Sequence, residues 1–326
     1  YGNHPSIVMW VPFNEGWGQF DTSRIAEWIK SYDPSRLVNS ASGWTDRGVG
    51  DVHDIHVYPG PGAPQPEEKR AAVLGEFGGL GLPLGGHTWQ EEKNWGYRSF
   101  KTREELTAAY ASLVQNLRPL VHSPGLSAAV YTQTTDVEIE VNGFMTYDRE
   151  LIKPEAKRVA AANRKVYLPP PVIETLVPTS QREGIEWRYT TAAPDDGWER
   201  TGFDDSSWKT GPGGFGNPTT PGAVVRTGWR TPDIWMRRAF EMPAGVKAKN
   251  PHLLFHHDED AEVYLNGVLA AKTTGYTTAY IYLALSDEGR AALQPGTNTL
   301  AVHCKQTGGG QYIDAGIVEV KEADEN

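Results

Sequence analysis

The order of apolar runs along the first 165 residues constrains the fold more than any other feature of this sequence. Short apolar runs of this kind are typical of strands that are buried on both faces of a parallel sheet. They alternate with amphipathic segments, which predicts an α/β fold with helices covering a parallel sheet. The runs lie at residues 7–13, 37–40, 52–58, 71–74 and 126–133.

Three segments between or after these runs carry helix signals. Thr102 and Glu105 have the spacing of a capping box, which predicts that a helix begins there. Pro154 suits the first position of a later helix, in which Val159 is expected to face inward. Residues 21–32 repeat apolar side chains at helical spacing (Ile25, Trp28, Ile29 and Tyr32), and so does the segment after Thr102 (Leu106, Tyr110, Leu113, Leu117 and Leu120).

The pattern changes at the proline-rich stretch 166–174, which we interpret as a stiff linker. Beyond it, residues 175–322 hold short apolar runs separated by turn signals, and Asn266-Gly267 is a strong hairpin signal. This spacing predicts an antiparallel β-sandwich. The expected organisation is therefore an α/β domain over 1–165, the linker, and an all-β domain over 175–322.

Charge and cysteine content exclude several classes of protein. The chain of 326 residues has 31 Lys and Arg against 41 Asp and Glu, a net charge of −10, which argues against nucleic acid as a partner. No apolar stretch of 18 residues is present, so no membrane span is expected. The single cysteine, Cys304, excludes a disulfide within the chain and a metal cluster built from cysteines.

Two glutamates follow apolar runs and have glycine neighbours. Glu15 comes after the run 7–13, and Glu76 lies 61 residues later, after the run 71–74. In a (β/α) barrel, the active site lies at the carboxyl ends of the strands. Cleavage of a glycosidic bond needs two carboxyl groups, one of which protonates the leaving oxygen. The alternative is that each glutamate is a solvated residue or an ion-pair partner at a strand end; for the two together we favour catalysis.

Three motifs in this order resemble glycoside hydrolase family 2. The stretch 3–10 with Asn14-Glu15 resembles the acid/base signature of that family, and 75–79 resembles its nucleophile strand. The stretch 131–138 with Asn142-Gly143 resembles its eighth strand and the loop that follows. The resemblance covers about residues 1–165 and implies strands four to eight of a (β/α)8 TIM barrel. It also implies that the first three strands and the N-terminal domains of the family lie outside this sequence, and we expect this chain by itself to be inactive.

The resemblance implies a role for each site residue. Glu15 would be the general acid/base and Glu76 the nucleophile of a retaining β-glycosidase, with no cofactor and no metal. Asn14 would bond the sugar 2-hydroxyl. The remaining candidates for contact with the substrate are His56, Tyr58 and Gln133, with Trp17 and Trp44 as platforms for a sugar ring.

The second half resembles galactose-binding-like jelly-roll domains over about residues 175–322. The resemblance rests on 198–208 and on 257–267. It implies either an accessory carbohydrate-binding module or a domain that braces the barrel.

Three other motifs are rejected on their context. The stretch 211–216 matches the dinucleotide fingerprint in letters, but no strand and helix surround it. The acidic alternation from Asp258 to Glu262 lacks the glycine that a calcium loop needs at its sixth position, where Val263 stands. His53 and His56 are expected on opposite faces of one strand, so they should not share a metal.

The predicted function is therefore hydrolysis of β-glycosides, with carbohydrate as the partner. The β-galactoside is the most common substrate in the family that the chain resembles, and β-glucuronide and β-mannoside stay open. The competing hypothesis is a non-catalytic carbohydrate-binding or scaffold protein with a degenerate barrel. The sequence does not decide the localisation, although exported relatives favour a periplasmic or secreted protein.

Overall fold

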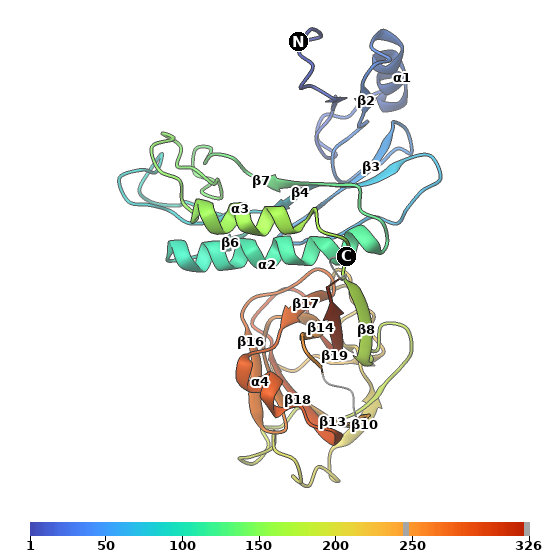
Figure 1. Cartoon of the computed structure of the whole chain (residues 1–326), viewed down its shortest axis with the longest axis vertical. Coiled ribbons are helices and arrows are strands. Elements are labelled where there is room, and N and C mark those ends of the chain that lie inside the picture. The colour runs from blue at the N-terminus through green and yellow to red at the C-terminus, as the bar shows by residue number, and fades with distance from the viewer. Residues whose placement is uncertain (244–247, 323–326) are drawn as a thin grey trace. The chain divides into compact units, whose positions relative to one another are not determined.

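The computed structural model describes residues 1–243 and 248–322, and the chain divides into two compact units, 1–170 and 171–326 (Figure 1). The first unit mixes strands and helices, and the second is built mainly of strands. None of the helices in the described ranges has both the length and the apolar character that crossing a membrane requires.

Parallel strand pairs form the framework of the first unit. β3 pairs with β4 and β4 with β7, so the three make one sheet, while β1 pairs with β2 and β5 with β6. All four of these pairings are parallel, as the alternation of strands and helices predicts. The strands are β1 (Met9–Trp10), β2 (Leu37–Val38), β3 (Val52–Val57), β4 (Ala71–Gly78), β5 (Leu80–Gly81), β6 (Arg98–Ser99) and β7 (Ala128–Thr132).

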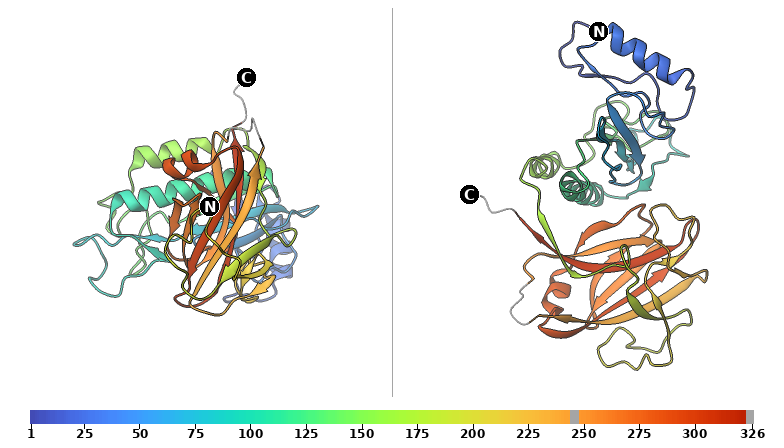
Figure 2. Two further views of the ribbon diagram at one scale, coloured as in Figure 1. Left: turned by 90° about the horizontal axis from the view of Figure 1, so that it is seen from below. Right: turned by 90° about the vertical axis from the view of Figure 1, so that its right-hand side faces the viewer.

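The helices of this unit are α1 (Thr22–Tyr32), α2 (Arg103–His122) and α3 (Ala156–Lys165), and α2 and α3 lie side by side in Figures 1 and 2. The predicted capping box of α2 is confirmed: Thr102 accepts a bond from the Glu105 amide at 3.1 Å, and Glu105 accepts one from the Thr102 amide at 3.1 Å. Tyr110 of α2 donates to Asn163 of α3 at 2.7 Å, which fixes the register of the two helices. A core of Leu80, Leu82, Leu106, Tyr110 and Val114 packs α2 against the strand side of the unit.

The helix predicted over 21–32 is confirmed as α1, and one other helix prediction is wrong in detail. Pro154 does not begin α3, because the Glu155 amide donates to the Thr107 hydroxyl at 2.9 Å and the helix starts only at Ala156. In α1, Trp28 and Tyr32 are exposed and stack on each other at 5.6 Å, while Thr22 and Ala26 are its buried residues.

Two segments also differ in extent from the prediction. The first strand spans only Met9–Trp10, because β2, its pairing partner, is equally short, and Val8 and Val11 are exposed. The last residues of the predicted linker 166–174 belong to a strand, β8 (Val172–Val177), because Val172 pairs with Lys321.

The second unit consists of two sheets. One has the order β10-β9-β13-β18-β15-β16, and the other has the order β12-β11-β19-β14-β17 with β8 added on β19. All pairings are antiparallel except that of β11 with β12. The elements are β8 (Val172–Val177), β9 (Glu186–Thr190), β10 (Lys209–Pro212), β11 (Phe215–Gly216), β12 (Thr227–Gly228), β13 (Asp233–Met242), β14 (Pro251–Asp258), β15 (Asp260–Leu265), β16 (Val268–Thr273), β17 (Ile281–Ala284), α4 (Asp287–Ala292), β18 (Gly296–Lys305) and β19 (Tyr312–Lys321).

One hydrophobic core joins the two sheets of this unit. It contains Ile234 and Val302 from the first sheet and Phe255 and Ile313 from the second, all fully buried. The sheets therefore face each other as a sandwich (Figure 2). The predicted turn at Asn266-Gly267 joins β15 to β16, and both residues have positive φ, 50° and 86°, as a two-residue type I′ hairpin requires.

A buried ion pair ties the loops of the first unit together. Lys153 Nζ lies 2.6 Å from Asp136 Oδ1, and the two side chains are 0% and 2% exposed. The ammonium also donates to the carbonyls of Leu82 at 3.2 Å and Val141 at 2.8 Å, and the Gly143 amide donates to Asp136 at 2.8 Å. The segments that follow β5 and β7 therefore share one set of polar contacts.

We expect Lys153→Met to destabilise the first unit by about 3–5 kcal/mol, because it leaves the Asp136 charge buried without its counter-ion. The measurement is the urea unfolding of the whole chain, followed by circular dichroism. Lys157→Met, which removes an exposed lysine from α3, is the matched control and should unfold like the wild type. Equal stability of the two variants would contradict the prediction.

Candidate functional site

The polar side chains expected at strand ends meet beside β3 and β4. Glu15 lies in the loop after β1, His56 in β3 and Glu76 in β4. Since β3 and β4 pair in parallel, His56 stands directly opposite Glu76. The three side chains thus come together from three segments of the chain.

A β-bulge at Gly75 sets the direction of Glu76. The ladder runs from Ile55 opposite Leu74 to His56 opposite Glu76, so Gly75 is an extra residue in β4. Its amide donates to Asp54 Oδ1 at 2.7 Å. A Cβ at this position would lie 2.2 Å from the Asp54 carboxylate, which only glycine avoids. Because side chains alternate between the faces of a strand, the extra residue brings Glu76 to the face of His56.

The two carboxylates approach each other closely. Oxygens of Glu15 and Glu76 and the Nδ1 of His56 all lie within 4.8 Å of one another. His56 Nδ1 is 3.1 Å from Glu15 Oε1 and 3.4 Å from Glu76 Oε2. The side chain of His56 is only 3% exposed, whereas those of Glu15 and Glu76 are 21% and 29% exposed. A buried imidazole therefore lies beside a carboxylate pair that solvent can reach.

Tyr58 supports Glu76. Its hydroxyl donates to Glu76 Oε2 at 2.5 Å, and its ring stacks on Tyr97 with centroids 3.7 Å apart. Burial, and then the bond to Glu76, raise the pKa of the Tyr58 phenol. The phenol consequently stays protonated near neutral pH and acts as a donor to the Glu76 carboxylate.

Glu15 is held from both its backbone and its side chain. Its amide donates to the Ser42 carbonyl at 2.6 Å, next to a parallel bridge between Asn14 and Ser42. The indole of Trp17 donates to Glu15 Oε2 at 3.0 Å. The φ of Glu15 is +56°, a left-handed conformation that non-glycine residues adopt at a cost and that is frequent at active sites.

Of the other predicted residues, the structure brings two near Glu15, and a third has a hydrogen-bond partner outside the carboxylate pair. Trp17 and Trp44 are exposed and meet edge to face, with centroids 5.6 Å apart. Gln133 instead bonds Asn142, through its amide nitrogen at 2.7 Å, and this contact does not involve the carboxylates.

Sequence reasoning missed Ser42 and Asn39, which bond the buried Asp54. Ser42 also lies 2.7 Å from His56 Nε2. The available signal was a group of small polar residues, Asn39, Ser40 and Ser42, that follows β2 at the carboxyl end of that strand. Gly43, next in the chain, has φ +88°, and a Cβ there would lie 2.7 Å from the His56 ring.

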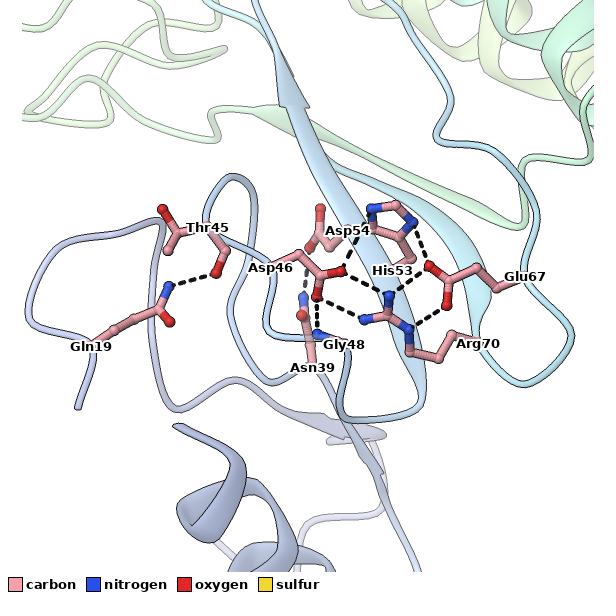
Figure 3. Close-up of polar contacts among 9 residues, drawn as sticks. All are labelled: Gln19, Asn39, Thr45, Asp46, Gly48, His53, Asp54, Glu67 and Arg70. Carbon is pink, nitrogen blue, oxygen red and sulfur yellow. Dashed lines mark hydrogen bonds and ion pairs between the residues drawn. The ribbon is translucent and has the colours of Figure 1, made fainter. Parts of the chain in front are cut away.

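Two further sets of histidine and acidic side chains occur in the first unit. In one, Asp46, His53 and Glu67 surround Arg70, whose guanidinium lies 2.7 Å from Asp46 and 2.6 Å from Glu67 (Figure 3). Arg70 already supplies the positive charge there, and it lowers the pKa of Asp46 to about 2. His53 and His56 thus contact different carboxylates. The other set is the hydrogen-bonded group of His87, Asp148 and Glu150.

Comparison with known proteins finds a family that is similar to part of the chain. The family model described as glycosyl hydrolases family 2, TIM barrel domain, matches residues 1–68. The predicted resemblance to glycoside hydrolase family 2 is therefore confirmed, and this segment is similar to the TIM barrel domain of that family. A search of curated proteins finds no match.

Solved structures similar to the chain include three glycosidases. A β-glycosidase from Bacteroides vulgatus is 18% identical, with 45% of this chain and 20% of that chain covered and a TM-score of 0.30. A β-glucuronidase from Bacteroides uniformis is 21% identical, with 45% of this chain and 18% of that chain covered and a TM-score of 0.32. A β-glucuronidase from Bifidobacterium dentium, complexed with coumarin-3-O-glucuronide, is 17% identical, with 41% of this chain and 20% of that chain covered and a TM-score of 0.30. The chain thus spans about a fifth of the length of these proteins.

We expect Gly43→Ala to destabilise the chain by about 1–3 kcal/mol more than Gly48→Ala, because the new methyl group would overlap the His56 ring. Both glycines have positive φ, +88° and +71°, so both variants carry backbone strain, but nothing lies within 4 Å of a Cβ at Gly48. Urea unfolding of the two variants measures the difference. Equal losses would show that His56 does not pack against Gly43.

Proposed function

We propose that the first unit carries the carboxylate pair of a retaining β-glycosidase. The observation that supports this is the approach of Glu15 and Glu76 oxygens to within 4.8 Å. Retaining enzymes hold their two carboxyl groups about 5–5.5 Å apart, whereas inverting enzymes leave about 6.5–9.5 Å for a water molecule. The separation here fits direct attack by one carboxylate on the sugar.

In the proposed reaction, the two carboxyl groups act in two steps. Glu76 attacks the anomeric carbon and forms an ester with the sugar, while Glu15 gives its proton to the leaving oxygen. Glu15 then takes a proton from a water molecule, and that water displaces Glu76 from the sugar. Two inversions at the same carbon produce net retention of configuration.

The assignment of roles follows the family resemblance, and the contacts of each residue fit it. A nucleophile must be ionised, and Glu76 accepts a short bond from the protonated Tyr58 hydroxyl. Glu15 lies beside the exposed rings of Trp17 and Trp44. Exposed aromatic rings suit the apolar face of a sugar, so the substrate would lie against them.

We take carbohydrate as the partner and a β-galactoside as the first substrate to test, with β-glucuronide and β-mannoside as rivals. For the second unit we propose a galactose-binding-like jelly roll. The non-catalytic hypothesis, a carbohydrate-binding or scaffold protein, remains the alternative outcome of the experiments below.

The first test is Glu76→Gln in the complete gene product that carries this sequence, assayed on aryl β-galactoside, β-glucuronide and β-mannoside. We expect the best activity of the wild type to fall by about 10³-fold or more, because the variant lacks its nucleophile. Glu104→Gln, an exposed glutamate in the first turn of α2, is the control and should keep full activity. Full activity of Glu76→Gln would refute the assignment, and an inactive wild type would favour the binding protein.

The second test uses azide with Glu15→Ala, on an aryl glycoside whose leaving group needs no acid. We expect azide to restore turnover, because it replaces the water that Glu15 would otherwise activate. The product should be the β-glycosyl azide, identified by nuclear magnetic resonance. An α-azide would instead indicate inversion and contradict double displacement.

A further inference from the structure

We infer that Ser42 and Asp54 are positioning residues which, through His56, keep a proton available to Glu15. The inference rests on the proposed function, and it concerns two residues that lie one and two hydrogen bonds away from the imidazole. The backbone carbonyl of Ser42 accepts the Glu15 amide, but the hydrogen bonds of the Ser42 and Asp54 side chains go to other groups than the carboxylate pair. The effect of these side chains would therefore pass through the orientation and tautomer of His56.

Asp54 is the fixed end of this series of bonds. It is buried and accepts three hydrogen bonds: from Asn39 Nδ2 at 2.6 Å (Figure 3), from the Gly75 amide at 2.7 Å and from the Ser42 hydroxyl at 3.0 Å. The amide donors cannot reverse their roles, so Asp54 acts as an acceptor toward its neighbours. Three donors around one carboxylate stabilise its ionised form against the effect of burial, which raises its pKa.

The role of Asp54 fixes the proton of Ser42. A hydroxyl has one hydrogen, and Ser42 directs it to Asp54. Toward His56, the Ser42 oxygen must therefore accept, and the Nε2 of His56, 2.7 Å away, must carry a hydrogen. This assignment leaves Nδ1 as the nitrogen that faces the carboxylates.

The tautomer has a consequence for Glu15. Neutral imidazole with its hydrogen on Nε2 has only a lone pair at Nδ1. A hydrogen bond over the 3.1 Å between Nδ1 and Glu15 Oε1 then needs one more proton, which sits on either atom. The pair of Glu15 and His56 thus holds one transferable proton while Glu76 is ionised.

Loss of the Ser42 hydroxyl would remove this constraint. The Nε2 hydrogen would then be buried without an acceptor, which costs free energy. The neutral ring would be more stable as the other tautomer, with its hydrogen on Nδ1 donated to an ionised Glu15. The charged groups that face Nδ1 are Glu15 from the loop after β1 and Glu76 from β4, both acidic. The general acid would then lack its proton when the leaving group departs.

The test compares two leaving groups on one sugar, in the complete gene product. The value of kcat/KM reports the steps up to departure of the leaving group. A 2,4-dinitrophenolate departs without help from an acid, whereas a phenolate needs a proton from the general acid. For Ser42→Ala we expect kcat/KM to fall about 10–100-fold on the phenyl glycoside and less than about 3-fold on the dinitrophenyl glycoside. Ser42→Thr restores the hydroxyl and should recover the phenyl activity to within about 3-fold of the wild type.

Ser127→Ala, at an exposed serine before β7, is the matched control and should behave like the wild type on both substrates. Equal losses of Ser42→Ala on both substrates would show a merely structural role and overturn the inference, as would the absence of any loss. These outcomes differ from failure of the proposed function. An inactive wild type, or a fully active Glu76→Gln, would overturn the proposed function and this inference with it.

Discussion

Two carboxylates placed within 4.8 Å of each other repel, and the surroundings of Glu15 and Glu76 are organised around that repulsion. Two neutral donors, the phenol of Tyr58 and the indole of Trp17, bond the carboxylates, and Nδ1 of His56 lies 3.1 Å from Glu15. Neutral donors stabilise a charge without cancelling it. This suits the proposed reaction, in which one group attacks and the other exchanges a proton.

The parallel framework makes such a meeting possible. Strands that run in the same direction end on the same edge of a sheet, so residues far apart in the chain are delivered to one place. The buried contact of Lys153 with Asp136 holds the loops that follow β5 and β7. The interior of this unit thus contains a buried ion pair in addition to its hydrophobic core.

Features that depend on neighbours in the sequence could be predicted, and features that depend on distant segments could not. The capping box at Thr102 and the hairpin at Asn266 are local, so their residue types were sufficient. The late start of α3 depends on a bond from the Glu155 amide to Thr107 of α2, and the sequence around Pro154 alone misjudged it. Glu15 and Glu76 stood out because each follows an apolar run. Ser42 did not, because its importance lies in a bond to a residue 14 positions away.

The bulge at Gly75 has a consequence for how such a site can evolve. Asp54 bonds the amide of the bulge, and through Ser42 it also reaches His56, which contacts Glu15. One buried aspartate is thus connected to the strand of the proposed nucleophile and to the partner of the proposed acid. The separation of the two carboxyl groups decides whether a glycosidase retains or inverts configuration. In this site, Asp54 links the positions of both carboxyl groups. In the proposed enzyme, retention of configuration would therefore depend on a buried aspartate that lies outside the carboxylate pair.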